Sequence, residues 1–415
     1  MAGRGTGLGV MVAWGALGGC MPNPAWDGCV GGDPCGSGTY CDPDSRECVS
    51  TPGLPPELDD LPLLEWMPVS RNVVAAASPC PADDCVYSGP NGQAAVVDGW
   101  NGGVYADAHG PFGGLMLWGA GSSNYNGNEV YFFDLATLLW STLSQPTDGR
   151  VPGDASTFEP DPQTCAWWDG APIPLETLGA AAYVGSIDAF VLPSALSSSR
   201  GDPRPEGGCS SGRGFSFSLD DATWSLLGDT LPDWEVDSPS AYDPSRDVLW
   251  TWVGSGQFAG YSIAEGTWTV HYDTGTRGSE AVAAIVPHLD LFVVADFEGG
   301  GGVRAMQLDN PFSPSTGIAT VGDTEIEQTF DPGFSWSESL GAIVTWSSGA
   351  PLYLLHPPET DWATEPWRWE RLEVAGDPPP APARGPYGRF QVIDKLGIAV
   401  VTTRVNEPVF AVRFQ

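Results

Sequence analysis

Short apolar runs separated by polar turns recur along most of this chain, and the clearest set lies between Gly99 and Leu143. The runs in this stretch are Val104–Ala106, Leu115–Trp118, Val130–Phe133 and Leu138–Leu143. Glycine, asparagine, serine and aspartate fill the gaps between them, and that composition is typical of tight turns between β-strands. The pattern therefore predicts a meander of four short strands.

Weaker copies of this four-strand pattern follow, and an aromatic residue after a polar turn marks the outermost strand of each copy. The marker positions are Trp140, Trp224, Trp268, Phe312 in the degenerate segment Leu308–Phe312, and Trp369. The steps from 224 to 268 and from 268 to 312 are both 44 residues. Propeller blades repeat at about 40–50 residues. The longer step from 140 to 224 is explained by one blade that carries two long insertions.

Each copy also contains apolar runs that suit the three inner strands of a blade. For the second to fifth blades these runs are Ala180–Val184, Ala189–Leu192 and Gly214–Ser218; Ser240–Tyr242, Val248–Val253 and Gly260–Ile263; Ala281–Val286, Leu291–Ala295 and Val303–Leu308; and Phe334–Trp336, Ala342–Trp346 and Leu352–Leu355.

The end of the chain supplies only three strands of a last blade, and one early strand has no neighbour to pair with. The three strands are Phe390–Ile393, Ile398–Thr402 and Val409–Phe414, and the early strand is residues 63–69 around Trp66. Pairing Trp66's strand with Val409–Phe414 closes the ring and removes exposed strand edges. The predicted fold is therefore all-β, a six-bladed β-propeller closed by an N-terminal strand, with seven blades as the alternative count.

The first residues have the features of an export signal. Arg4 gives a positive start, Leu8–Leu17 is a short apolar core, and Cys20 follows a pair of small residues. The core is too short to span a bilayer, which takes about 20 apolar residues. The segment resembles the lipobox of bacterial lipoproteins, and the resemblance implies that residues 1–19 are a signal peptide and that Cys20 is lipidated. An ordinary signal peptide cut at another position is the alternative.

Residues 20–53 are predicted to be a small separate module before the propeller at residues 54–415. A segment this short cannot bury a sufficient core, so disulfides must hold it. Export to an oxidising compartment favours such bonds. Four cysteines allow three connectivities, and the sequence does not choose among them. These cysteines are Cys29, Cys35, Cys41 and Cys48.

The chain carries a formal net charge of −35, with 52 acidic residues against 17 lysines and arginines. Lys395 is the only lysine. Nucleic acid is a polyanion and needs a basic surface, so a nucleic-acid partner is excluded. Electrostatic binding to anionic lipid is excluded on the same ground. A solvated acidic surface is the favoured interpretation, and electrostatic steering of cationic ligands is the sharper alternative.

Residues 95–143 carry a family resemblance. Gly119 and Gly121 follow an apolar run, and the pattern Tyr131-x-Phe133-Asp134-x-x-Thr137-x-x-Trp140 comes after them. This arrangement resembles the Kelch repeat of galactose-oxidase-type β-propellers, and residues 178–415 resemble it only loosely. The resemblance implies a propeller and says almost nothing about activity.

Two classes of propeller enzyme make demands that the sequence does not meet. Galactose oxidases would need converging copper ligands, whereas the four histidines, His109, His271, His288 and His356, fall in different blades. Sialidases would need Ser-x-Asp-x-Gly-x-x-Trp repeats, which this chain lacks. No catalytic residue, metal or cofactor is predicted. Acidic loops such as Asp154–Asp161 are candidates for Ca²⁺, because that ion is held by several oxygen ligands.

Two insertions, residues 145–178 and 193–212, are predicted to lie on one face of the propeller. One leads into the first strand of the second blade, and the other joins that blade's second and third strands. Each holds one cysteine, and a Cys165–Cys209 disulfide would hold the two loops together. Cys80 and Cys85 are expected to form a local disulfide loop on the same face. Long loops on a rigid scaffold commonly carry function. The candidate binding residues are Glu159, Asp161, Trp167, Trp168, Arg200 and Arg204.

The leading functional hypothesis is a monomeric, lipid-anchored binding module at the outer membrane or cell surface. Its predicted partner is a protein or a glycan, because aromatic rings beside acids and arginines suit both kinds of contact. A secreted carbohydrate-active enzyme, an oxidase or a hydrolase, is the first alternative, and a structural envelope protein is the second. Aromatic loops that only fill the mouth of the propeller are a further interpretation.

Overall fold

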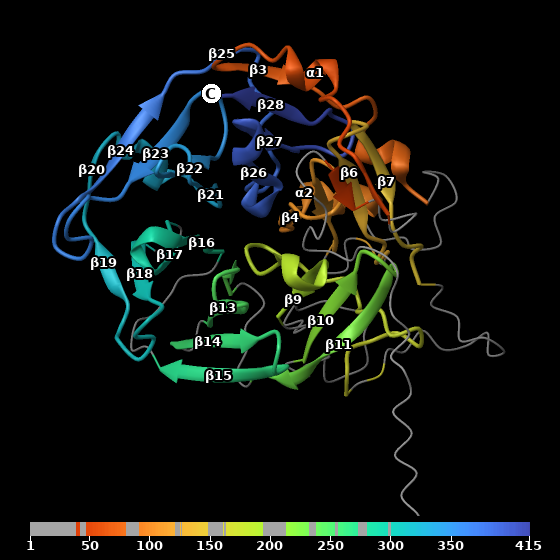
Figure 1. Cartoon of the computed structure of the whole chain (residues 1–415), viewed down its shortest axis with the longest axis horizontal. Helices are drawn as coiled ribbons and strands as arrows, with labels where there is room; N and C mark the ends of the chain where they lie inside the picture. Colours follow the sequence, from red (N-terminus) through yellow and green to blue (C-terminus); the bar gives the residue numbers. More distant parts are fainter. Residues whose placement is uncertain are drawn as a thin grey trace, which may run out of the picture.

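The structure, a computed structural model, shows a six-bladed β-propeller (Figure 1). It describes residues 39–41, 47–79, 91–120, 125, 127–147, 161, 163–193, 213–231, 238–253, 256–272, 280–297 and 300–415. Six sheets of four or five strands stand around a central axis, and each is a meander in which neighbours along the chain pair antiparallel. The predicted fold class is confirmed.

The first three blades are four-stranded sheets that follow the predicted order from the axis outward. Blade one contains β4 (Gly103–Ala106), β5 (Gly114–Leu117), β6 (Tyr131–Asp134) and β7 (Leu139–Thr142). Blade two contains β8 (Ala182–Val184), β9 (Ala189–Leu192), β10 (Arg213–Ser218) and β11 (Thr223–Thr230). Blade three contains β12 (Ser240–Asp243), β13 (Val248–Val253), β14 (Gln257–Ser262) and β15 (Thr267–Tyr272).

The other three blades are a four-stranded and two five-stranded sheets. Blade four contains β16 (Val282–Val286), β17 (Leu291–Asp296), β18 (Gly302–Gln307) and β19 (Thr316–Ile318). Blade five contains β21 (Gly333–Ser337), β22 (Ala342–Trp346), β23 (Leu352–His356), β24 (Trp367–Leu372) and an added outer strand, β20 (Thr320–Gly322). Blade six contains β26 (Phe390–Ile393), β27 (Ile398–Val401), β28 (Phe410–Arg413), β3 (Glu65–Pro68) and the added outer strand β25 (Ala375–Gly376).

The ring is closed between the two ends of the propeller, as the sequence predicts. β3 pairs antiparallel with β28, with Ala411 opposite Met67, and the two strands lie side by side at the top of Figure 1. Trp66 at the centre of β3 is 1% exposed. Its indole N–H donates to the carbonyl of Ala350 in blade five at 2.8 Å. β3 therefore completes blade six by pairing with β28, and it also ties that blade to blade five through Trp66.

The predicted outer strand of blade four is wrong. Leu308–Phe312 forms a turn, and the fourth strand is β19, which pairs with β18. Pro311 has no N–H to donate to a sheet ladder and is disfavoured inside a strand. Phe312 is 71% exposed, unlike the buried Trp369 of β24. The equal 44-residue spacing therefore aligned a turn residue with true strand positions.

The outer edge of a blade is covered at four places, three times by the chain that leaves the preceding blade and once by the last strand of that blade. β20 pairs parallel with β24, and β25 pairs parallel with β3. Asn72 exchanges two hydrogen bonds with the backbone of Trp140 on β7, at 2.6 and 2.9 Å. Asp229 accepts a hydrogen bond from the backbone N–H of Trp268 on β15 at 3.4 Å. These contacts protect strand edges that could otherwise pair with another chain.

The ring has two faces, which differ in the loops they hold. The upper face holds the loops that lead into each innermost strand, and the lower face holds the turns that join each innermost strand to the second strand. The six turns of the lower face are residues 107–113, 185–188, 244–247, 287–290, 338–341 and 394–397.

Contacts between neighbouring blades, made at the lower face by the turns and the adjoining strand ends, run around the whole ring. They are His109–Asp188 at 3.1 Å, Ser186–Asp247 at 2.5 Å, Arg246–Asp290 at 2.6 Å, the His288 and Trp336 rings at 5.2 Å, Ser337–Asp394 at 2.6 Å, and Lys395 with the Asp107 carbonyl at 3.0 Å. Each contact joins one blade to the next. The innermost strands are therefore held in register by polar contacts as well as by the apolar clusters between blades.

Before the propeller, β1 (Thr39–Cys41) and β2 (Cys48–Ser50) form a small antiparallel hairpin in which Cys41 stands opposite Cys48. Cys20, Cys29, Cys35, Cys80 and Cys85 lie outside the described residues. The disulfide-rich module, its connectivity, the signal peptide and the division into domains stay predictions. Within the described part of the chain, no helix is long and apolar enough to cross a bilayer.

Candidate functional site

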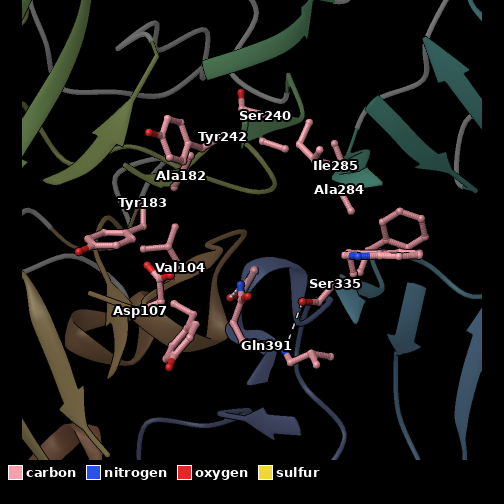
Figure 2. A pocket seen from close by; sticks show the side chains of 18 of the residues that line it. Val104, Asp107, Ala182, Tyr183, Ser240, Tyr242, Ala284, Ile285, Ser335 and Gln391 are labelled. Atoms are coloured by element: carbon pink, nitrogen blue, oxygen red, sulfur yellow. Dashed lines mark hydrogen bonds between the residues drawn. The ribbon is translucent and has the colours of Figure 1, made fainter. Parts of the chain in front are cut away.

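A cavity of about 900 Å³ lies at the centre of the ring, within the usual size of small-molecule sites, which is about 300–1,000 Å³. All six innermost strands, β4, β8, β12, β16, β21 and β26, contribute to its wall. Both apolar and polar side chains line it (Figure 2). The residues labelled there include Val104, Asp107, Tyr183, Tyr242, Ser335 and Gln391.

Bulky side chains fill the upper end of this cavity. Leu178, Val282, Phe334 and Tyr387 come from four different blades, and each is between 0% and 7% exposed. Tyr387 lies in the segment that leads into blade six. Its hydroxyl also donates to the carboxylate of Glu280, in the segment that leads into blade four, at 3.2 Å. Blades four and six are not neighbours, so this hydrogen bond crosses above blade five.

Glycines allow the backbones at the upper end to approach one another closely. A Cβ on Gly388 would lie 1.9 Å from the carbonyl oxygen of Gly103, and a Cβ on Gly179 would lie 2.5 Å from that of Ala281. Contacts below 3.0 Å are not tolerated by real side chains, so only glycine fits at these two positions. The described residues thus narrow the upper end of the cavity.

The lower end of the cavity is open. Its lining residues on the lower-face turns are exposed, in contrast to those at the upper end: Asp107, Ser186, Pro244, Pro287, Glu338 and Lys395. Because the described residues narrow the upper end and leave the lower end accessible, a ligand would enter from the lower face.

Aromatic side chains on three innermost strands point their polar atoms at carboxylates near this opening. The Tyr183 hydroxyl donates to Asp188 at 2.5 Å, and the Tyr242 hydroxyl donates to Asp247 at 2.7 Å. The Trp336 indole N–H donates to Glu338 at 2.9 Å. Burial raises the pKa of Tyr183, and burial raises the pKa of Tyr242 to about 12. The phenols are therefore neutral at physiological pH.

The corner between blades one and six combines a ring, an acid and an ammonium group. The Lys395 Nζ lies 5.8 Å from the centre of the Tyr105 ring and donates to the Asp107 carbonyl. The Tyr105 hydroxyl donates to the carbonyl of Phe112 at 2.6 Å, which fixes the ring. Desolvation raises the pKa of the Asp107 carboxyl, although water reaches it in the cavity, and the charge of Lys395 partly opposes that rise.

The described residues contain no group of three or more histidine, cysteine, aspartate or glutamate side chains that could hold a metal ion. His109 pairs with Asp188 and His271 packs against Trp250 and Phe258, so the two lie in separate surroundings. The chemistry of the cavity wall suits reversible contact: hydrogen bonds, aromatic faces and charge.

Comparisons with known proteins assign no function to the chain. No family model matches it, and no curated protein matches it. Among solved structures, the chain is similar to a structural genomics protein of unknown function from Bacteroides thetaiotaomicron, with 10% sequence identity and a TM-score of 0.43. The match covers 78% of this chain and 74% of that one.

The binding residues predicted from the sequence are only partly described. Asp161 is exposed, and Trp168 is 53% exposed. Trp167 packs against the apolar cluster between blades one and two. Glu159, Arg200, Arg204 and Cys209 lie outside the described residues, as does the segment Asp154–Asp161 apart from its last residue.

Much of the described loop at residues 163–178 packs into the fold. Cys165 is 0% exposed and disulfide-bonded, but its partner is not among the described residues, so the Cys165–Cys209 pairing stays a prediction. Ile173 and Leu175 are also buried, and Asn128 donates to the Pro172 carbonyl at 3.1 Å. Of the aromatic pair in this loop, Trp168 alone offers a large exposed surface.

Sequence reasoning missed the residues around the lower opening, although a signal for them exists. Five of these turns end in an aspartate or a glycine with a left-handed backbone, directly before the apolar second strand, and their φ values are 43° to 63°. These residues are Asp188, Asp247, Asp290, Gly341 and Gly397. Aligning the chain on this turn would have placed the innermost strands of these five blades, and with them most of the cavity lining.

Proposed function

We propose that this protein is an exported binding module that receives part of a protein or glycan partner in the central cavity, through the lower face. The observation that carries the proposal is a cavity filled at one end and open at the other, with a wall of mixed polarity. Clefts that combine apolar area with a few placed polar groups are the usual form of ligand sites.

Several finer parts of this proposal come from the sequence. A lipid anchor on Cys20 would hold the module at the outer membrane or cell surface. The loops at residues 145–178 and 193–212 remain a competing contact surface on the upper face. Trp168 is an exposed aromatic residue of the first loop, and substituting it tests this upper surface against the cavity.

Filling the cavity tests the proposal. Ala283 on β16 lines the cavity and is half-buried. We expect Ala283→Trp to occupy the space that a ligand needs and to reduce capture of partners from a panel of glycans and surface proteins by at least about tenfold. Ile285→Trp on the same strand is a second variant with the same expected effect, and thermal unfolding checks that both variants fold.

The control is Trp168→Ala, which removes the exposed aromatic surface of the upper loop and leaves the cavity unchanged. Capture by this variant should match that of the wild type. If Trp168→Ala abolishes capture while both cavity-filling variants bind normally, the site belongs to the upper loops and the cavity proposal fails.

A further inference from the structure

We propose that the group which enters the cavity is an alkylammonium, carried either by a small quaternary amine or by a lysine side chain of a partner protein. This inference rests on the proposed function. It is carried by three observations: aromatic side chains of the cavity wall paired with carboxylates, an ammonium group that already lies near another aromatic ring of the wall, and an excess of acids around the opening.

The first observation is the pairing of ring and acid. Tyr183, Tyr242 and Trp336 each line the cavity and each donate a hydrogen bond to a carboxylate on the lower face. The negative face of an aromatic ring attracts a cation. A carboxylate that accepts a hydrogen bond from the ring's O–H or N–H adds electron density to the ring. The negative charge of the carboxylate also attracts a cation.

The second observation is the position of Lys395. It is the only lysine of the chain, and its ammonium group lies within reach of the Tyr105 ring at the cavity wall. Cation–π contacts act within about 6 Å of the ring centre. This corner of the cavity therefore accepts an ammonium group in the structure itself, and Lys395 occupies a place that a ligand cation could share or take.

The third observation is charge. The six lower-face turns carry six carboxylates against one arginine and one lysine, and Asp243 at the end of β12 adds a seventh carboxylate beside them. The six belong to Asp107, Asp188, Asp247, Asp290, Glu338 and Asp394. The whole chain has a net charge of −35. Such a field raises the local concentration of cations and repels anions, so acidic sugars and acidic peptides are disfavoured at this opening.

A pair of isosteric probes tests the inference. Choline carries a quaternary ammonium, and 3,3-dimethyl-1-butanol has the same shape with a neutral carbon in place of nitrogen. Titration calorimetry on the purified full-length protein should show choline binding at least about tenfold more tightly than the alcohol. A peptide containing one lysine, compared with its acetyl-lysine form, distinguishes a protein source of the ammonium from a small-molecule source.

Two variants test whether the cation binds at the corner formed by Tyr105, Asp107 and Lys395. Asp107→Asn removes a negative charge from the corner, and we expect it to weaken choline binding about fivefold. Lys395→Gln removes the competing ammonium but keeps a donor for the Asp107 carbonyl, and we expect it to strengthen choline binding about fivefold. Raising the salt concentration should weaken binding of choline and leave the alcohol unaffected.

The outcomes separate the inference from the proposed function. Equal binding of choline and the alcohol would show a merely apolar site and overturn the inference. Absence of binding by choline and by the lysine peptide, while Ala283→Trp still abolishes partner capture, overturns the inference and leaves the proposed function standing. Normal capture by both cavity-filling variants overturns the two together.

Discussion

At the scale of single residues, buried acids are the costly feature of this protein. Glu129 is 2% exposed and accepts hydrogen bonds from the hydroxyls of Tyr125 at 2.7 Å and Tyr131 at 2.5 Å. Burial nevertheless raises its pKa above the ordinary value of 4.5, because desolvation outweighs those two hydrogen bonds. Its charge therefore destabilises the folded state at neutral pH.

The pH dependence of stability follows from the direction in which the pKa of Glu129 moves. The folded state holds the Glu129 proton more tightly than the unfolded state does, so its contribution to the free energy of unfolding rises as pH falls from above the folded pKa toward 4.5. Glu129→Gln removes the charge. We expect its stability advantage over the wild type to be larger at pH 8 than at pH 5.

Urea denaturation at the two pH values measures this difference. Glu265→Gln makes the same change of charge at an exposed position and serves as the control. A stability difference for Glu129→Gln that stays constant between pH 5 and pH 8 would contradict the assignment of a raised pKa.

At the scale of elements, alternation of apolar and polar residues was enough to predict most strands. It failed at Leu308–Phe312, because spacing carries no information about the missing N–H of Pro311. It also missed β20 and β25, which have three and two residues and no pattern of their own. These short strands exist because the next blade offers an unpaired edge, and that is a tertiary cause absent from local sequence.

The edge contact made by Asn72 has a measurable energy. Its side-chain amide pairs with both backbone groups of Trp140, as a neighbouring strand would. Asn72→Ala leaves the Trp140 N–H and carbonyl without these partners, and leaving such a group unsatisfied costs about 1–3 kcal/mol. We expect a loss of that size in the free energy of unfolding, measured by urea denaturation.

Asn310→Ala is the matched control for this change. Asn310 is exposed and its side chain bonds only locally, to Ser313 in the same turn, at 2.7 Å. Its removal should cost no more than about 0.5 kcal/mol. Equal losses in the free energy of unfolding for the two variants would show that the hydrogen bonds of Asn72 to β7 do not stabilise the fold.

At the scale of the whole molecule, closure of the ring was predictable and the position of the opening was not. The sequence contains a lone strand around Trp66 and a last blade with only three strands. Pairing the two removes both exposed strand edges, and the structure shows this pairing. The open end of the cavity depends instead on how Leu178, Phe334 and Tyr387 from separate blades meet above the axis. No local pattern records such a meeting, so sequence reasoning turned to the long upper loops.

Hydrogen–deuterium exchange, with and without a captured partner, tests the binding site most directly. If the ligand enters from the lower face, binding should slow exchange in the turns at residues 107–113, 185–188 and 394–397. The loop at residues 163–178 should exchange at an unchanged rate. Protection confined to that upper loop, with none in the lower-face turns, would contradict the account.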